Sequence, residues 1–137
     1  MKKKIGWGML FLLFLISCTD SDLPKVNGMW QLKTIEDTEN HTISQVDTIF
    51  YAFQRDVLFT YTVLYEKENA PATSEVLYGY VTFPSENKML LELDERYHSL
   101  LHLTFWTDTS VAYDVLKLDA KNMVLSADNK IYSFIKY

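Results

Sequence analysis

Residues 57–66 read VLFTYTVLYE, and this stretch decides the fold class of the chain. Its odd-numbered positions carry the large apolar side chains Val57, Phe59, Tyr61, Val63 and Tyr65. Alternate side chains of a β-strand point to opposite faces, so the pattern predicts a strand with one buried face. Comparable segments rich in Val, Ile, Thr, Tyr and Phe recur every ten to fourteen residues, and none keeps a 3.6-residue period. The chain therefore reads as all-β.

Eight strands are predicted in this way. They are Met29 to Glu36, Thr48 to Gln54, Val57 to Glu66, Glu75 to Phe83, Lys88 to Leu93, Val111 to Leu118, Asn122 to Ala127 and Lys130 to Tyr137. Residues 100–105 would supply a ninth strand, and the polar residues 37–46 read as a loop with one helical turn at 43–46. Short connections favour antiparallel neighbours in chain order. We therefore expect an antiparallel, up-and-down, eight-stranded barrel, with a two-sheet β-sandwich as the alternative.

Two of these strands, the first and the fourth, carry more specific expectations. In the first strand, alternation places Trp30, Leu32 and Thr34 on one face and Ile35 on the other. In the fourth strand, Gly79 lies mid-strand, where glycine often marks a bulge or a sharp bend. Such a bend would help the sheet to close on itself.

The chain begins with a segment that reads as a secretory signal. Lysines at positions 2 to 4 precede an apolar run over residues 5–16, and Ser17 precedes Cys18, the only cysteine. The apolar run is shorter than the ~20 residues that a permanent membrane helix needs. This is the pattern of a bacterial lipoprotein signal, so we expect residues 1–17 to be removed and lipid to be attached to Cys18.

Residues 18–25 would then form a tether, and residues 26–137 are enough for a single domain with one core. The tether contains Thr19-Asp20-Ser21-Asp22, which resembles the acidic export tag of surface-exposed lipoproteins of Bacteroidetes-type bacteria. We therefore expect a protein held by lipid in the bacterial cell envelope, at the outer membrane. The tag favours display at the surface over a periplasmic position.

The mature chain would be acidic. Removing residues 1–17 takes away three lysines and changes the formal net charge from −5 to −8. Nucleic-acid affinity comes mainly from neutralising phosphates, so this charge gives no reason to expect a nucleic-acid partner. Lipid on Cys18 would consume the one cysteine and leave no thiol for a disulfide, a metal ion or a nucleophile.

The two ends of the predicted domain carry a family resemblance. Residues 26–32 read VNGMWQL, and residues 115–125 and 132–136 form the closing segments. These stretches are similar to the Gly-x-Trp opening and the closing hairpins of lipocalin-like lipoproteins of Bacteroidetes. The resemblance implies a lipocalin-like barrel in which Gly28 permits a tight entry and Trp30 plugs the closed end. The chain departs from classical lipocalins in lacking their disulfide and their second and third motifs.

Catalytic and metal-binding patterns are sparse in the sequence. On a helix, His98 and His102 would share one face and could bind zinc. In the strand that we expect here, they would lie about 13 Å apart, too far for one metal ion. The sequence holds no nucleophile elbow and no phosphate-binding glycine loop. We therefore expect no metal, no cofactor and no enzymatic activity.

Aromatic residues are the remaining signal for a binding site, since the mature chain carries nine Tyr, six Phe and two Trp. A tyrosine ring with its polar tip suits a pocket of mixed polarity, although tyrosines also fill the cores of small barrels. The candidates that would line a ligand pocket are Tyr51, Tyr61, Tyr65, Tyr78, Tyr80 and Tyr113.

Three functions fit these features. The first is non-enzymatic binding of a small apolar or amphipathic ligand inside the barrel. The second is an interaction module that binds an envelope protein, a glycan or a host protein through an outer aromatic patch. The third is an inhibitor or scaffold whose loops at 37–47, 67–74 and 94–99 carry recognition. An open cavity would favour the first function, and a filled interior with an outer aromatic patch would favour the second.

Overall fold

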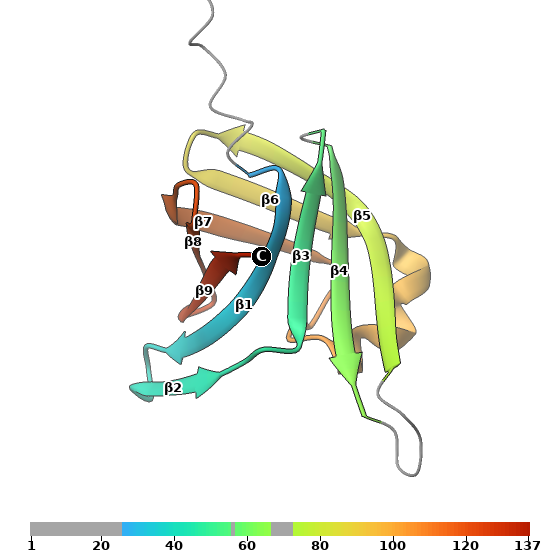
Figure 1. Cartoon of the computed structure of the whole chain (residues 1–137), viewed down its shortest axis with the longest axis horizontal. Coiled ribbons are helices and arrows are strands. Elements are labelled where there is room, and N and C mark those ends of the chain that lie inside the picture. Colours follow the sequence, from blue (N-terminus) through green and yellow to red (C-terminus); the bar gives the residue numbers. More distant parts are fainter. Residues whose placement is uncertain (1–25, 56, 67–72) are drawn as a thin grey trace, which may run out of the picture.

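The computed structural model describes residues 26–55, 57–66 and 73–137, and they form one sheet of nine strands (Figure 1). The strands are β1 (Gly28–Asp37), β2 (Thr42–Gln45), β3 (Ile49–Gln54), β4 (Leu58–Tyr65), β5 (Thr73–Ser85), β6 (Lys88–Leu93), β7 (Ser110–Leu118), β8 (Asn122–Ala127) and β9 (Lys130–Lys136). No helix within this described part is long and apolar enough to cross a membrane.

The sheet closes into a barrel because β1 pairs with β9 as well as with β3. Neighbouring strands are antiparallel and follow chain order from β3 to β9. The short β2 pairs only with the second half of β1, on the same edge where β3 pairs with the first half. It therefore adds no ninth strand to the ring. Eight strands therefore form the wall, which confirms the predicted barrel and excludes the two-sheet sandwich.

Two local predictions were wrong. Residues 42–45 form β2 rather than part of a loop with a helical turn, because β1 runs past β3 and leaves an edge that residues 42–45 can pair with. Residues 100–105 do not form a strand, since residues Glu95–Leu103 form the 3₁₀-helix η2. Asp94 caps this helix, and its carboxylate accepts a hydrogen bond from the backbone N–H of Arg96 at 3.0 Å.

A β-bulge changes which side chains of β1 face the interior. The register with β9 shifts between Leu32 and Thr34, so β1 carries one extra residue there. Trp30 and Leu32 share one face, as predicted, and this face points inward; beyond the bulge, however, Ile35 is buried instead of Thr34. Similar shifts occur in β5 and β7, and the added twist helps the strands to curve around the core.

Gly79 marks a close approach of two strand backbones. Its register is unbroken towards both Phe59 on β4 and Leu93 on β6, so the bulge, one of the two features expected there, is absent at this residue. A Cβ atom built at Gly79 would lie 2.0 Å from the carbonyl oxygen of Glu92. The glycine thus lets β6 approach β5 at the last pair of residues that the two strands share.

The barrel has two ends that differ in how they are covered. At the entry end lie the start of β1 and the hairpins at 54–58, 85–88 and 118–122. At the opposite end, which we call the mouth end, the residues after β6 form a long connection to β7. This connection, residues 94–109, contains η2 and is drawn in orange in Figure 1.

Replacement of Gly79 by Ala is expected to lower the free energy of unfolding by about 1–3 kcal/mol, because the added methyl would overlap the backbone of Glu92. Thr82→Ala, at an exposed position of the same strand, is the matched control and should change stability far less. Urea unfolding of both variants tests this. Equal midpoints for the two variants would show that the strands can separate without cost.

Candidate functional site

The six candidate tyrosines divide between the two faces of the barrel wall. Tyr51, Tyr61 and Tyr113 point into the interior and are almost completely buried. Tyr78 and Tyr80 point outward and are 55% and 59% exposed. The structure therefore brings three of the candidates together inside and places two of them on the outer surface.

Tyr65, the sixth candidate, lies apart from both groups. It is the last residue of β4, at the mouth end, and it is only partly buried. Its hydroxyl donates a hydrogen bond to the Glu75 carboxylate at 3.3 Å.

A hydrogen bond between two tyrosines spans the barrel. The hydroxyl oxygens of Tyr51 on β3 and Tyr113 on β7 lie 3.0 Å apart, and these strands occupy opposite sides of the eight-stranded ring. The indole N–H of Trp106 reaches both oxygens, at 2.9 Å from Tyr51 and 3.1 Å from Tyr113. We call these three residues the cross-barrel triad.

Aromatic rings pack tightly around the triad. The ring of Trp106 is stacked on Phe59 with centroids 5.8 Å apart, and it meets Tyr61 edge to face at 5.5 Å. Tyr51 also contacts Phe134 from β9 at 4.7 Å. These side chains fill the middle of the barrel, so this part of the interior is a packed core.

Burial controls the protonation of the inner tyrosines. Desolvation raises the pKa of Tyr51 well above its usual value, and it raises the pKa values of Tyr61 and Tyr113 in the same direction. All three phenols therefore keep their protons at neutral pH. They act as neutral hydrogen-bonding groups and are poor nucleophiles or bases.

A pocket of about 120 Å³ opens at the mouth end beside the triad. Trp106 and Tyr113 form its inner wall, and Tyr132 lies next to Tyr113 with the rings edge to face at 5.5 Å. Asp128 and Lys130 also line this mouth pocket. Its floor is aromatic and its rim carries one charge of each sign.

The side chain that closes the mouth does not belong to the barrel wall. Trp106 lies on the 94–109 connection, whose ends are tied to the strands by backbone hydrogen bonds from Asp94 to Tyr78 and from Leu93 to Thr109. Between these two ends, the backbone N–H of Phe105 donates to a side chain of the wall, the Tyr61 hydroxyl, at 3.3 Å. The connection is thus held mainly by side chains, which pack on the core at Leu101 and Trp106.

Gly28 and Trp30, the predicted closure of the barrel, lie at the entry end. Gly28 has a φ of 116°, a conformation that favours glycine. Trp30 is fully buried, and its indole N–H donates to the carbonyl oxygen of Val26 at 2.8 Å. The ammonium of Lys136 lies 4.6 Å from the centre of the Trp30 ring. Cys18, the expected lipid attachment site, lies outside the described residues.

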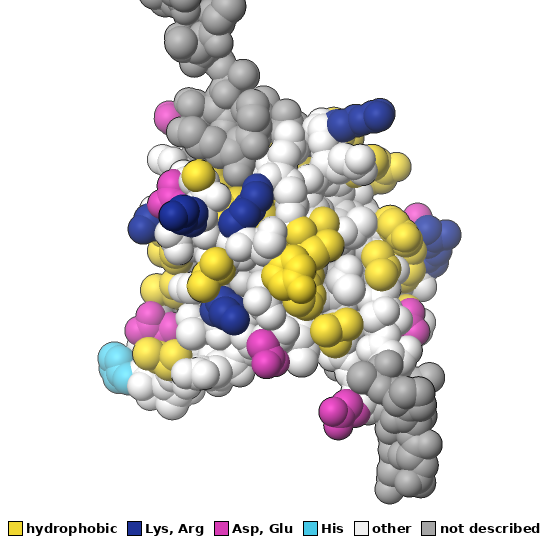
Figure 2. Space-filling view, viewed as in Figure 1, with side chains coloured by type: hydrophobic (Ala, Val, Ile, Leu, Met, Phe, Trp, Pro, Cys, Tyr) yellow, Lys and Arg dark blue, Asp and Glu magenta, His cyan; other side chains and the backbone are white. Residues whose placement is uncertain are grey.

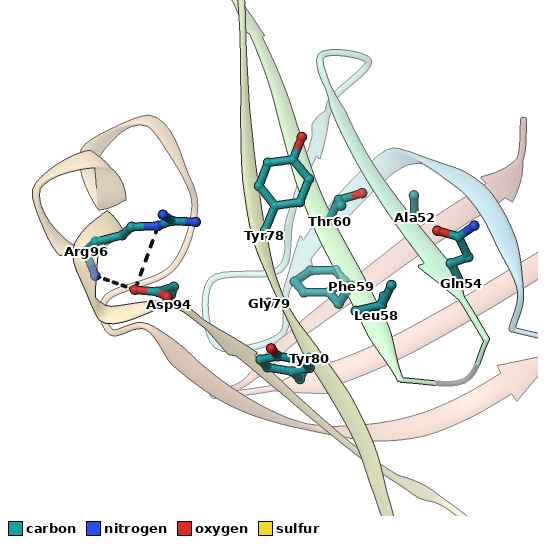
Figure 3. Close-up of a pocket in the computed structure, with 10 residues that line it drawn as sticks. All are labelled: Ala52, Gln54, Leu58, Phe59, Thr60, Tyr78, Gly79, Tyr80, Asp94 and Arg96. Carbon is teal, nitrogen blue, oxygen red and sulfur yellow. Dashed lines mark hydrogen bonds and ion pairs between the residues drawn. The ribbon is translucent and has the colours of Figure 1, made fainter.

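A second hollow, the outer groove, lies on the outward side of β3, β4 and β5 (Figure 3). It encloses about 250 Å³, and Tyr78, Tyr80 and Thr60 contribute to its walls. Asp94 and Arg96 from the start of the 94–109 connection also line it. Figure 2 shows hydrophobic side chains gathered on the face that carries these strands.

The histidines lie on the surface. His98 and His102 are exposed on η2, where three residues per turn place positions four apart on different faces. A ring nitrogen of His102 lies 3.0 Å from the carbonyl oxygen of Ser99. Within the described ranges, no group of three His, Cys, Asp or Glu side chains is arranged to hold a metal ion.

Sequence reasoning missed two residues of the interior site. Tyr132 alternates with Phe134 in β9, and this period of two could have assigned it to the interior. The signal for Trp106 was weaker: it is a large aromatic residue followed by the polar residues 107–110. Its insertion into the barrel depends on the path of residues 94–109.

Comparison with known proteins gives a family and a fold. The family model described as a lipocalin-like domain matches residues 11–137. A lipocalin-like protein from Bacteroides uniformis ATCC 8492 superposes with a TM-score of 0.73 at 19% identity, covering 82% of this chain and 99% of that one. An uncharacterised protein from Bacteroides eggerthii DSM 20697 gives 0.66 at 24% identity, with the same coverage of 82% and 99%.

A more distant solved structure shares the fold. Japanin from Rhipicephalus appendiculatus, bound to cholesterol, gives a TM-score of 0.59 at 10% identity, covering 85% of this chain and 79% of that chain. No curated protein matches the sequence. The family match spans nearly the whole chain, and the closed antiparallel barrel agrees with it. This chain belongs to the lipocalin-like domain family.

Proposed function

We propose that this protein is a lipid-anchored component of the bacterial cell envelope whose barrel binds a small apolar or amphipathic molecule from the mouth end. The membership of the lipocalin-like family supports a binding function. The groups around the mouth pocket are mainly phenol, indole and aliphatic side chains, which suit binding without catalysis. Attachment through Cys18 follows from the signal sequence alone.

One observation carries this proposal, namely that the side chain that closes the mouth does not belong to the barrel wall. Trp106 fills the space next to the pocket, yet it belongs to the 94–109 connection and not to the wall. Segments held by few backbone hydrogen bonds open at lower cost than the strands that they cover. The barrel can therefore stay closed as a ring while its mouth opens.

The size of the pocket requires that Trp106 moves. Sites for small molecules usually enclose about 300–1,000 Å³, whereas the mouth pocket encloses about 120 Å³. Exposing the buried indole costs about 3 kcal/mol, and losing its hydrogen bonds costs about 1 kcal/mol more. The open form would then be populated at roughly one part in a thousand, and a ligand must repay this difference.

The chemistry of the mouth favours an amphipathic ligand. An apolar body would pack on the aromatic floor, and a polar group would remain at the rim near Asp128 and Lys130. Japanin, which shares the fold, is bound to cholesterol, a molecule of this class.

The outer groove supports a second candidate function, which is binding of a protein or glycan partner. Tyr78 and Tyr80 expose more than half of their surface beside Asp94 and Arg96. Exposed aromatic rings next to charged groups are typical of interaction sites. The filled middle of the barrel favours this function, whereas the mouth pocket favours the first.

Ligand entry is expected to move Trp106 and leave Trp30 in place. The protein labelled with 5-fluorotryptophan and held in lipid nanodiscs should show a ¹⁹F shift and a larger solvent isotope effect at Trp106 when palmitic acid or cholesterol is added. Trp30, which is fully buried at the other end, serves as the internal reference. A Trp106 resonance that stays unchanged at saturating concentrations of both probes would contradict the proposal.

Attachment through Cys18 is expected to depend on its thiol. Cells fed an alkyne analogue of palmitate should label the native chain, and Cys18→Ala should abolish the label. Ser21→Ala, in the same expected tether, is the control and should keep it. Persistent labelling of the Cys18→Ala variant would refute lipidation at this residue.

The second candidate function makes a separate prediction. If the outer groove binds a partner, replacing both Tyr78 and Tyr80 by Ser should abolish cross-linking to that partner in intact cells. Tyr137→Ser is the matched control, because Tyr137 is 76% exposed but lies outside the groove. Cross-linking that survives the double replacement would exclude the groove as the contact surface.

A further inference from the structure

One polar hydrogen of the cross-barrel triad has no acceptor within the triad. The indole N–H of Trp106 donates and cannot accept, so the two hydroxyl oxygens must serve as acceptors. One of the two tyrosines donates its hydrogen to the other across 3.0 Å. The hydroxyl hydrogen of the second tyrosine has no acceptor among the described residues.

This spare donor is buried and keeps its hydrogen. Tyr51 and Tyr113 are each 1% exposed, so neither hydroxyl is open to bulk solvent. Buried polar groups are nearly always hydrogen-bonded, and an exception calls for an explanation. Burial also raises the pKa of both phenols, which keeps them as donors at neutral pH.

The spare donor lies where a ligand from the mouth would arrive. Tyr113 and Trp106 belong both to the triad and to the lining of the mouth pocket. If the indole leaves, the space that it vacates is continuous with this pocket. The vacated space is flat, because Phe59 lies parallel to the indole within 13°.

We infer that the Tyr51 and Tyr113 hydroxyls form the polar subsite of the barrel, that the Trp106 indole occupies this subsite in the closed form, and that a flat apolar ring system carrying an oxygen acceptor replaces it. This inference rests on the proposed function and names its ligand class. An acceptor such as a carbonyl or ether oxygen would use the hydrogen that the indole leaves unpaired. An indole-like donor would leave that hydrogen unpaired again.

The test uses a matched pair of probes on the full chain in nanodiscs. Trp106→Gly opens the flat space, and the probes are 6-fluoro-1-tetralone, which carries a carbonyl oxygen, and 6-fluorotetralin, which lacks it. The ¹⁹F resonance of each probe reports the bound fraction. Replacing both Tyr51 and Tyr113 by Phe in the Trp106→Gly background removes the donors and keeps the rings.

The informative quantity is the ratio of the two affinities, compared between the variants. Partition of the probes into lipid is the same in every sample and cancels from this comparison. The tetralone-to-tetralin ratio should fall by about five- to tenfold when both hydroxyls are removed. Tyr132→Phe in the same background is the control, since Tyr132 lines the mouth pocket outside the triad, and it should leave the ratio unchanged.

Two failures can be told apart. If both probes bind but the ratio is the same with and without the hydroxyls, the polar subsite is wrong and the proposed binding function stands. If neither probe binds a Trp106→Gly chain that is folded, as judged by a native 5-fluoro-Trp30 signal, the polar subsite and the proposed binding function are both wrong. Should Trp106→Gly not fold, the same ratio is measured on the native chain and on the chain with both Tyr51 and Tyr113 replaced by Phe, with the same expected fall.

Discussion

The contact between Tyr51, Tyr113 and Trp106 couples the wall of the barrel to the segment that covers its mouth. Tyr51 and Tyr113 join opposite walls, and the indole donates to both from a connection that is not part of the sheet. Because the interior of an eight-stranded barrel is just wide enough to be filled by side chains, three large aromatic residues suffice to occupy its centre. The same contact therefore stabilises the core and, in the proposed function, would decide whether the barrel can receive a ligand.

The shape of the wall follows from where β-pairing is interrupted. The bulge in β1 turns Ile35 inward and sends Thr34 towards the surface. Gly79 allows the backbone of β6 to approach β5 closely, and β6 ends at Leu93, the residue that pairs with Gly79. Beyond that point β5 continues without β6, and η2 begins there with Asp94 hydrogen-bonded to Tyr78. Because the pairing of β6 with β5 ends here, the chain leaves the sheet and forms the connection that carries Trp106. The start of this connection also forms one side of the outer groove.

The protein presents two aromatic surfaces with opposite properties. The inner surface is buried and hydrogen-bonded, and in the proposed function a ligand would reach it only when Trp106 leaves. The outer groove is accessible without rearrangement, and Asp94 and Arg96 give it charges of both signs. Binding inside the barrel would move the 94–109 connection, and this connection also contributes Asp94 and Arg96 to the outer groove. The two surfaces are therefore linked through one segment of the chain.

The sequence by itself was enough to predict the all-β class, eight of the nine strands to within two residues at each end, the ring closure and the inward side of β4. A period of two and short connections depend on neighbouring residues. Outside β4, the sequence could not tell which tyrosines face inward. In β5 both faces are apolar, and the inward direction of Leu77 and Val81 sends Tyr78 and Tyr80 outside. Only the tertiary structure decided this, and it also decided that the Trp106 indole donates to the hydroxyls of Tyr51 and Tyr113. In the sequence, Trp106 lies 55 positions from Tyr51 and 7 positions from Tyr113. The contacts depend on how the closed ring brings distant strands face to face.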